Sequence, residues 1–107
     1  MNQKNTPKVE NLNHLLTIQD GAVVSRTLVN EKTGTITLFA FGQNEGLSEH
    51  TAPYDAFVQV LEGTLEVIIS SKPYQLGSGD MLIMPANEPH ALKAQTPVKM
   101  LLVMIRS

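Results

Sequence analysis

Short runs of apolar residues, broken by turn residues, make up most of the chain. The runs are rich in Val, Ile, Thr and Phe, and Gly, Pro, Asn or Asp separates them, which is typical of strands and turns. The pattern predicts strands over residues 22–29, 35–41, 47–50, 56–61, 64–70, 73–76, 81–84, 91–94 and 98–105. Many short strands with almost no helix indicate an all-β sandwich or small barrel.

One segment near the N-terminus has helical rather than strand spacing. Its apolar residues recur at roughly helical spacing, at Val9, Leu12, Leu15, Leu16 and Ile18. An Asp-Gly pair follows and ends the pattern. We therefore expect a short helix or helical turn before the first strand.

Two of the predicted strands are apolar on both faces. In residues 35–41, Leu38 points to one side and Phe39 to the other, while residues 100–105 contain no polar residue at all. A strand with no polar, solvent-exposed face needs a further layer of protein on the side away from its own core. We expect a second copy of the chain to supply that layer in a homodimer. The alternative is that the N-terminal helical segment covers it.

Length, composition and charge exclude several classes of protein. The chain has 107 residues and a mass of 11.7 kDa, which suits one domain over residues 1–107. It contains no cysteine, so disulfides are excluded. Its 8 basic and 10 acidic residues give a net charge of −2, and the basic residues are scattered, so we expect no nucleic-acid partner. No apolar run is long enough for a signal peptide or a membrane span, so we expect no membrane partner and a cytoplasmic location.

Two of the three histidines lie in well-defined sequence surroundings. His50 opens the stretch H-T-A-P-Y-D-A-F-V-Q-V-L-E-G, and His90 closes the stretch G-D-M-L-I-M-P-A-N-E-P-H, whereas His14 lies in the predicted helical segment. These two stretches resemble the two sequence motifs of the cupins, small barrels of the double-stranded β-helix or jelly-roll type. The resemblance covers about residues 35–105. It implies an all-β cupin barrel with a short N-terminal helical segment.

The match to the cupin motifs is partial. The motifs are commonly written G-x5-H-x-H-x3,4-E-x6-G and G-x5-P-x-G-x2-H-x3-N. The chain matches the first motif at His50 and Gly63, and the second at Gly79, Pro85 and His90. It departs at Asn44 and Asn87, where glycine is usual, at Ala52 for the second histidine, at Ala56 for the glutamate and at Ala94 for the asparagine.

The departures remove half of the metal ligands that the resemblance implies. The family motif supplies three nitrogens and one oxygen, and this chain retains only His50 and His90. Ala52 and Ala56 take the places of the lost imidazole and carboxylate, so we expect them to form apolar walls of the pocket. Firm sites usually need three or four protein ligands, so we expect a divalent transition metal (Zn, Ni, Fe or Mn) to bind weakly, with water completing its shell.

Two more residues are candidates for the pocket. Gln59 is a candidate additional ligand, although strand alternation turns it away from the face that Ala56 occupies. A β-bulge would reverse that parity, and bulges are common beside functional sites. Tyr54, in the turn at the barrel mouth, is a candidate to hydrogen-bond a ligand. Its alternative role is to cover apolar neighbours.

The resemblance therefore implies a small-molecule-binding cupin with a partial two-histidine metal site and no strong catalysis. The alternative is a metal-dependent cupin enzyme, a dioxygenase or an isomerase, with His50 and His90 as metal ligands. The missing ligands weigh against an enzyme, because oxygen-activating iron commonly needs a carboxylate as well. Without a metal, the two histidines would form an acid–base pair or serve as hydrogen-bonded structural residues.

Overall fold

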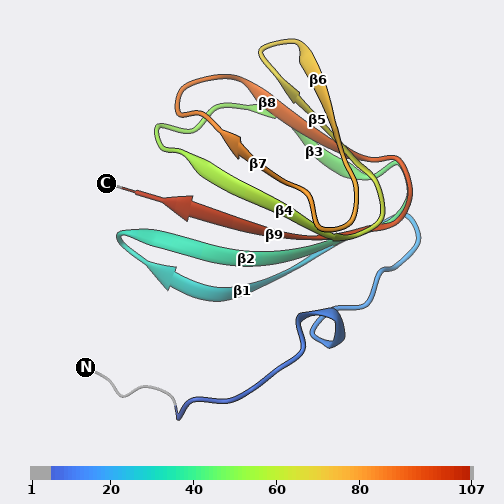
Figure 1. Cartoon of the computed structure of the whole chain (residues 1–107), viewed down its shortest axis with the longest axis vertical. Coiled ribbons are helices and arrows are strands. Elements are labelled where there is room, and N and C mark those ends of the chain that lie inside the picture. The colour runs from blue at the N-terminus through green and yellow to red at the C-terminus, as the bar shows by residue number, and fades with distance from the viewer. Residues whose placement is uncertain (1–5, 107) are drawn as a thin grey trace.

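Two antiparallel β-sheets face each other in the computed structural model, which describes residues 6–106 (Figure 1). A single turn of 3-10 helix, η1, spans Leu12–His14. The strands are β1 (Val23–Glu31), β2 (Gly34–Phe41), β3 (Gly46–His50), β4 (Ala56–Glu62), β5 (Leu65–Ile69), β6 (Lys72–Leu76), β7 (Met81–Met84), β8 (His90–Ala94) and β9 (Val98–Ile105). Each predicted strand is confirmed, with its ends within two residues of the prediction.

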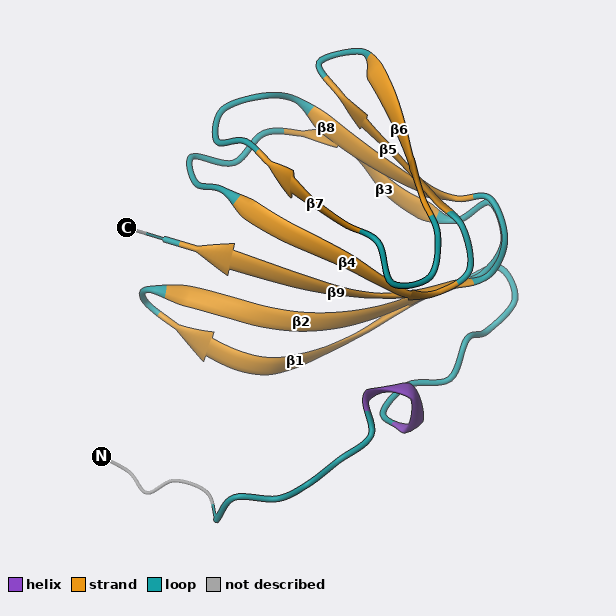
Figure 2. Ribbon diagram, viewed as in Figure 1, coloured by secondary structure: helices purple, strands orange, loops and turns teal. Residues whose placement is uncertain are grey.

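The chain crosses repeatedly between the two sheets. One sheet has the strand order β1-β2-β9-β4-β7 and the other has the order β3-β8-β5-β6 (Figure 2). Every strand pairing is antiparallel. The chain changes sheet after β2, β3, β4, β6, β7 and β8, so most neighbours within a sheet come from distant parts of the sequence. This two-layer arrangement confirms the predicted jelly-roll class.

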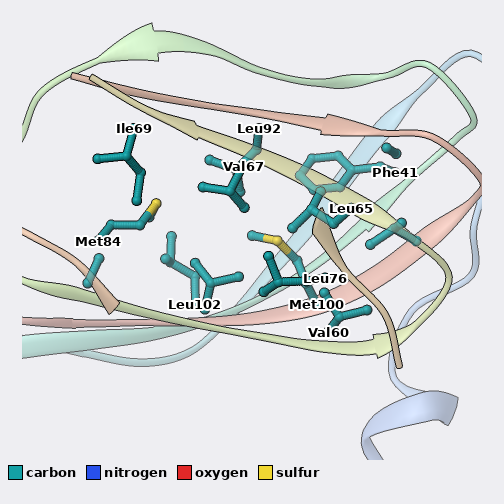
Figure 3. Close-up of a cluster of buried hydrophobic side chains, with 14 residues drawn as sticks. Phe41, Val60, Leu65, Val67, Ile69, Leu76, Met84, Leu92, Met100 and Leu102 are labelled. Atoms are coloured by element: carbon teal, nitrogen blue, oxygen red, sulfur yellow. The ribbon is translucent and has the colours of Figure 1, made fainter. Parts of the chain in front are cut away.

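The core fills the space between the sheets with alternate residues from strands of both sheets (Figure 3). On β4, Val58 and Val60 are fully buried while Gln59 between them is not. β5 repeats the pattern with Leu65 and Val67. Period-two alternation therefore sets the inner face of these strands.

The outer face of the five-stranded sheet is also apolar, as the sequence predicted. Leu38 and Ala40 are fully buried, yet they lie outside the core cluster to which Phe41 belongs. On β9, Leu102 is buried inside and Val103 points outward, opposite Ile36 of β2. Both faces of these strands are thus partly covered.

The N-terminal segment supplies part of the outer cover. Lys99 Nζ donates to Asn13 O at 2.6 Å, and an Arg26 guanidinium nitrogen lies 3.5 Å from Leu15 O. Arg26 and Lys99 pair with Leu38 and Ala40 of β2, so the segment lies over those two buried residues. The helical element is shorter than the apolar spacing suggested. The side chain of Asn11 accepts from Asn13 N, and such local hydrogen bonds favour caps and turns over continued helix.

The two asparagines at family glycine positions have the backbone conformation of glycine. Asn44 has φ 70° and Asn87 has φ 66°. Asparagine visits this left-handed region more readily than other non-glycine residues, because its short amide hydrogen-bonds locally. The two departures from the motif therefore preserve the turns. Within residues 6–106, no helix is both long and apolar enough to cross a membrane.

Candidate functional site

A small cavity opens between the sheets at the end of the barrel where β3, β7 and β9 finish and β4 and β8 begin. In Figure 1 this is the end from which the C-terminus emerges. The cavity has a volume of about 30 Å³, which is room for one or two water molecules. Its lining residues are Leu47, His50, Ala52, Ala56, Met84, His90, Leu92, Leu102 and Met104.

The two predicted histidines meet in this cavity. His50 and His90 are direct partners in the pairing of β3 with β8. Their Nε2 atoms are 3.1 Å apart, and the rings are inclined at 73° with centroids 4.3 Å apart. His90 is only 4% exposed, whereas His50 lies at the exposed mouth. The pair therefore connects the interior with solvent.

Hydrogen bonds to the backbone orient both rings. His50 Nδ1 lies 2.8 Å from Ser48 O, and His90 Nδ1 lies 3.2 Å from Glu88 O. A carbonyl oxygen can only accept, so each Nδ1 donates its hydrogen, and each neutral ring then has a bare lone pair on Nε2. Two lone pairs face each other across 3.1 Å. In this tautomer the two nitrogens can ligate a metal ion, whereas the tautomer with hydrogen on one Nε2 gives a hydrogen bond between the two neutral rings.

The separation of the two nitrogens suits one metal ion. With metal–nitrogen bonds of about 2.0–2.1 Å, a 3.1 Å separation corresponds to a ligand–metal–ligand angle of about 95–100°. That angle lies between the octahedral and tetrahedral values, so the separation of the two nitrogens is compatible with one ion bound by both rings. Ligating histidines commonly donate their other ring N–H to a backbone carbonyl, as both do here.

Burial lowers the pKa of His90 below its ordinary value of 6.5. Loss of solvent contact is the largest cause, and the nearby His50 lowers the pKa further, while the hydrogen bond to Glu88 O opposes both effects. The imidazole of His90 is therefore neutral near pH 7. Neutral imidazole is the form that ligates metals.

Ala52 and Ala56 line the cavity, and their methyl groups stand where the family motif has an imidazole and a carboxylate. Among the described residues, no three His, Cys, Asp or Glu side chains are grouped to hold a metal ion. The set of three nitrogens and one oxygen is therefore absent. The residues present do not fit a complete divalent-metal centre of the family type, and only the histidine pair remains of it.

The prediction of Gln59 as an additional ligand is wrong. Gln59 pairs with Leu101 on one side and Met81 on the other, on the opposite face of β4 from Ala56. The irregularity in the pairing of β4 falls after Val60, which is too late to reverse the parity of Gln59. Its side chain therefore points away from the cavity.

Tyr54 does not line the cavity, which contradicts its predicted place in the pocket. Its ring lies 5.5 Å from the guanidinium of Arg106, and the side chain is half-buried. The neighbouring Asp55 accepts from Ala86 N at 2.9 Å, while Asn87 N donates to Ala52 O at 2.7 Å. These contacts hold the loop that leads to His90 against the loop that follows His50.

Two residues that sequence reasoning missed are the methionines of the cavity. Ala56 pairs with Met84 of β7 on one side and with Met104 of β9 on the other. All three residues face inward on neighbouring strands. Strand parity could have placed each methionine inside, but only the pairing of β4 with β7 and β9 brings the two together beside Ala56.

A larger groove lies elsewhere, between the edge strands β6 and β7. It has a volume of about 340 Å³, and its lining residues are Ile69, Ser70, Lys72, Tyr74, Leu82, Ile83, Pro85 and Glu88. Its polar contacts are to neighbours: Ser70 Oγ donates to Glu88 Oε1 at 3.1 Å, and the ammonium of Lys72 lies 5.5 Å from the centre of the Tyr74 ring. The polar groups do not converge on a common point, so the histidine cavity is the better candidate site.

Comparison with known proteins identifies relatives across the whole chain. A family model described as Cupin domain matches residues 37–105. A conserved protein of unknown function from Streptococcus pyogenes is 34% identical, with 99% of this chain and 93% of that chain covered and a TM-score of 0.91. A cupin 2 conserved barrel domain protein from Leptotrichia buccalis is 37% identical, with a TM-score of 0.88, and the match covers 91% of this chain and 47% of that one. A cupin superfamily protein from Desulfitobacterium hafniense is 26% identical over the full length of both chains, with a TM-score of 0.89. No curated protein shows a significant match.

Proposed function

The chain belongs to the cupin family, and on that premise we propose that its barrel is a small binding module centred on His50 and His90. The pair holds a divalent transition metal weakly, and the remaining coordination positions are open to water or a small ligand. The observation that carries the proposal is the approach of two Nε2 atoms to 3.1 Å, with both Nδ1 atoms within hydrogen-bond distance of backbone carbonyls.

The size of the cavity limits the ligand. A volume of about 30 Å³ holds a metal ion with one or two water molecules, or a molecule of very few heavy atoms. Drug-sized ligands occupy pockets of about 300–1,000 Å³, so a ligand of that size would require the barrel mouth to open. Apolar walls surround the two imidazoles, so a ligand would make its polar contacts with the histidines or the metal ion.

The cavity supplies few groups for catalysis. Apart from His50 and His90, none of its lining residues is titratable. A general acid–base role would fall on the same two rings that hold the metal, and oxygen-activating iron commonly needs a third protein ligand. Structural relatives under 25% identity share the fold alone. We therefore propose binding rather than an enzymatic activity.

We further propose that the outer face of the five-stranded sheet pairs with a second copy of the chain. The N-terminal segment lies over Leu38 and Ala40, but Ile83 is 46% exposed and Ile105 is 61% exposed on the same face. Val103 between them is half-buried. Exposed apolar residues gathered on one sheet face mark an interaction surface.

Titration calorimetry with Zn²⁺, Ni²⁺ and Mn²⁺ tests the proposed site. The wild type should bind one ion per chain, and His50→Ala or His90→Ala should lower the affinity at least tenfold, because each removes one of two protein ligands. His14→Ala is the matched control, since His14 lies in η1 and should leave binding unchanged. Equal binding by the wild type and His50→Ala would overturn the site. No binding by the wild type at millimolar metal would overturn the metal site and leave a hydrogen bond between the two neutral rings.

A further inference from the structure

We propose that the cation best suited to this cavity is Cu(I), bound by the thioethers of Met84 and Met104 together with the imidazoles of His50 and His90. This assignment rests on the proposed function, because it uses the same histidine pair. It goes beyond that function by naming two further ligands and a soft monovalent metal.

The side-chain donor atoms of the cavity are nitrogen and sulfur only. Of its nine lining residues, four have a side chain with a donor atom, namely the two histidines and the two methionines. The other five are Leu47, Ala52, Ala56, Leu92 and Leu102, which are hydrocarbon throughout. No side-chain oxygen reaches the cavity, and the set available to a cation is therefore two imidazoles and two thioethers.

The methionines flank the position where the family motif has its carboxylate. Ala56 is the direct partner of Met84 on β7 and of Met104 on β9. Directly opposed side chains on one sheet face have Cβ atoms about 4.5–5.5 Å apart, which is within reach of a long, flexible methionine. Figure 3 shows the Met84 side chain extending into the space between the sheets, close to Leu102. With alanine at the glutamate position, the two neighbours of Ala56 that line the cavity both carry sulfur.

This change of donors alters the metal preference. Carboxylate oxygen favours hard divalent ions, whereas thioether sulfur is a soft ligand that selects Cu(I). The surroundings favour a monovalent ion as well, because the walls are apolar, Met84 is only 3% exposed and no carboxylate is present to balance a double charge. His50 at the exposed mouth gives the ion a path from solvent to the interior.

Methionine is also common in cores as a filler, so the test must separate ligation from packing. The chain offers a matched control in Met100. It lies on the same face of β9 as Met104 and is fully buried, but it does not line the cavity. Replacing methionine by leucine conserves volume and removes only the sulfur, so each variant should fold.

The experiment is an anaerobic competition for Cu(I), generated with excess reductant, against a chromophoric Cu(I) chelator. Zn²⁺ titrations are run on the same proteins. Met84→Leu and Met104→Leu should each lower the Cu(I) affinity at least tenfold and leave the Zn²⁺ affinity unchanged. Met100→Leu should change neither, and His90→Ala should weaken both metals. X-ray absorption of the Cu(I)-loaded wild type should show sulfur as well as nitrogen neighbours.

The outcomes separate this assignment from the proposed function. If both methionine variants bind Cu(I) as the wild type does, or if copper has no sulfur neighbours, Cu(I) ligation by the thioethers is overturned. The histidine site then stands on its Zn²⁺ titrations. If the histidine variants bind Zn²⁺ and Cu(I) as the wild type does, the histidine site falls, and the Cu(I) assignment falls with it.

Discussion

Restoring the two missing ligands should convert a weak metal site into a firm one. The variant is Ala52→His together with Ala56→Glu, which returns an imidazole and a carboxylate to positions that line the cavity. Losing even a group that only supports a metal ligand typically costs 10–100-fold in affinity, so two restored ligands should together tighten the site by about 100-fold or more.

The expected shift in Tm follows from the linkage between metal binding and folding. At 1 mM Zn²⁺, a site with a Kd of about 0.1 mM stabilises the folded chain by about 1.4 kcal/mol, and a site 100-fold tighter stabilises it by about 4.1 kcal/mol. The difference of about 2.7 kcal/mol corresponds to about 10 °C in Tm at roughly 4 °C per kcal/mol. The two larger side chains must enter a cavity of about 30 Å³, so the metal-free variant should be destabilised by about 1–3 kcal/mol.

The assay compares thermal unfolding with Zn²⁺ and with a chelator. The readout is the shift in Tm that the metal causes, because this difference cancels the packing cost. Ala52→Phe with Ala56→Leu is the control, since it adds similar bulk without ligands and should reproduce only the loss of stability. A metal-induced shift in the restored variant no larger than in the wild type would refute the placement of the metal beside these residues.

Three other predictions concern the interface, the pH dependence and a turn. The chain should sediment near twice its mass of 11.7 kDa. Val103→Asp should give a folded monomer, because Val103 points outward on β9. A wild-type monomer at micromolar concentration would contradict the dimer. The lowered pKa of His90 means that the unfolded chain takes up a proton at higher pH than the folded one, so the stability of the metal-free protein should fall as the pH drops below about 6.5 and level off below the native pKa. His90→Gln should lose this pH-dependent part of the stability in urea titrations across that range. Parallel curves of stability against pH for the two proteins would contradict the prediction. Ser71 has φ 71° in the two-residue turn between β5 and β6, a backbone conformation that glycine adopts without strain. Ser71→Gly should therefore stabilise the chain by about 1 kcal/mol and raise Tm by about 4 °C. An unchanged melting curve would argue against strain at Ser71.

Part of the candidate site follows from local sequence rules alone. Alternation from His50 assigns an inward position to Ala52, and the resemblance to the cupin motifs implies an inward position for Ala56 and a meeting of His50 with His90. The structure bears out that meeting, with the two Nε2 atoms at 3.1 Å. The orientation of each ring could not be predicted from the sequence, because it depends on contacts with the carbonyl oxygens of Ser48 and Glu88.

The direction of the Gln59 side chain could not be predicted from strand alternation alone, because it also depends on how β4 pairs with a distant strand. Whether a bulge reverses its direction is decided by the pairing of β4 with β9, and the irregularity falls beyond it, after Val60. Tyr54 likewise lies beside Arg106, a residue more than fifty positions away in the sequence. No local pattern contains either relationship.

The sequence by itself determined the number, positions and faces of the strands and the family to which the barrel belongs. The strands depend on neighbours one to four residues apart, where backbone geometry turns a periodic pattern directly into structure, and the family depends on the residue spacing within the two motifs. Only the tertiary structure decided that Met84 and Met104 flank Ala56, that the N-terminal segment lies over Leu38, and that two Nε2 atoms approach each other in the cavity. Each depends on the register between strands or segments far apart in the chain, and that register is set by packing of the whole core rather than by any local run of residues.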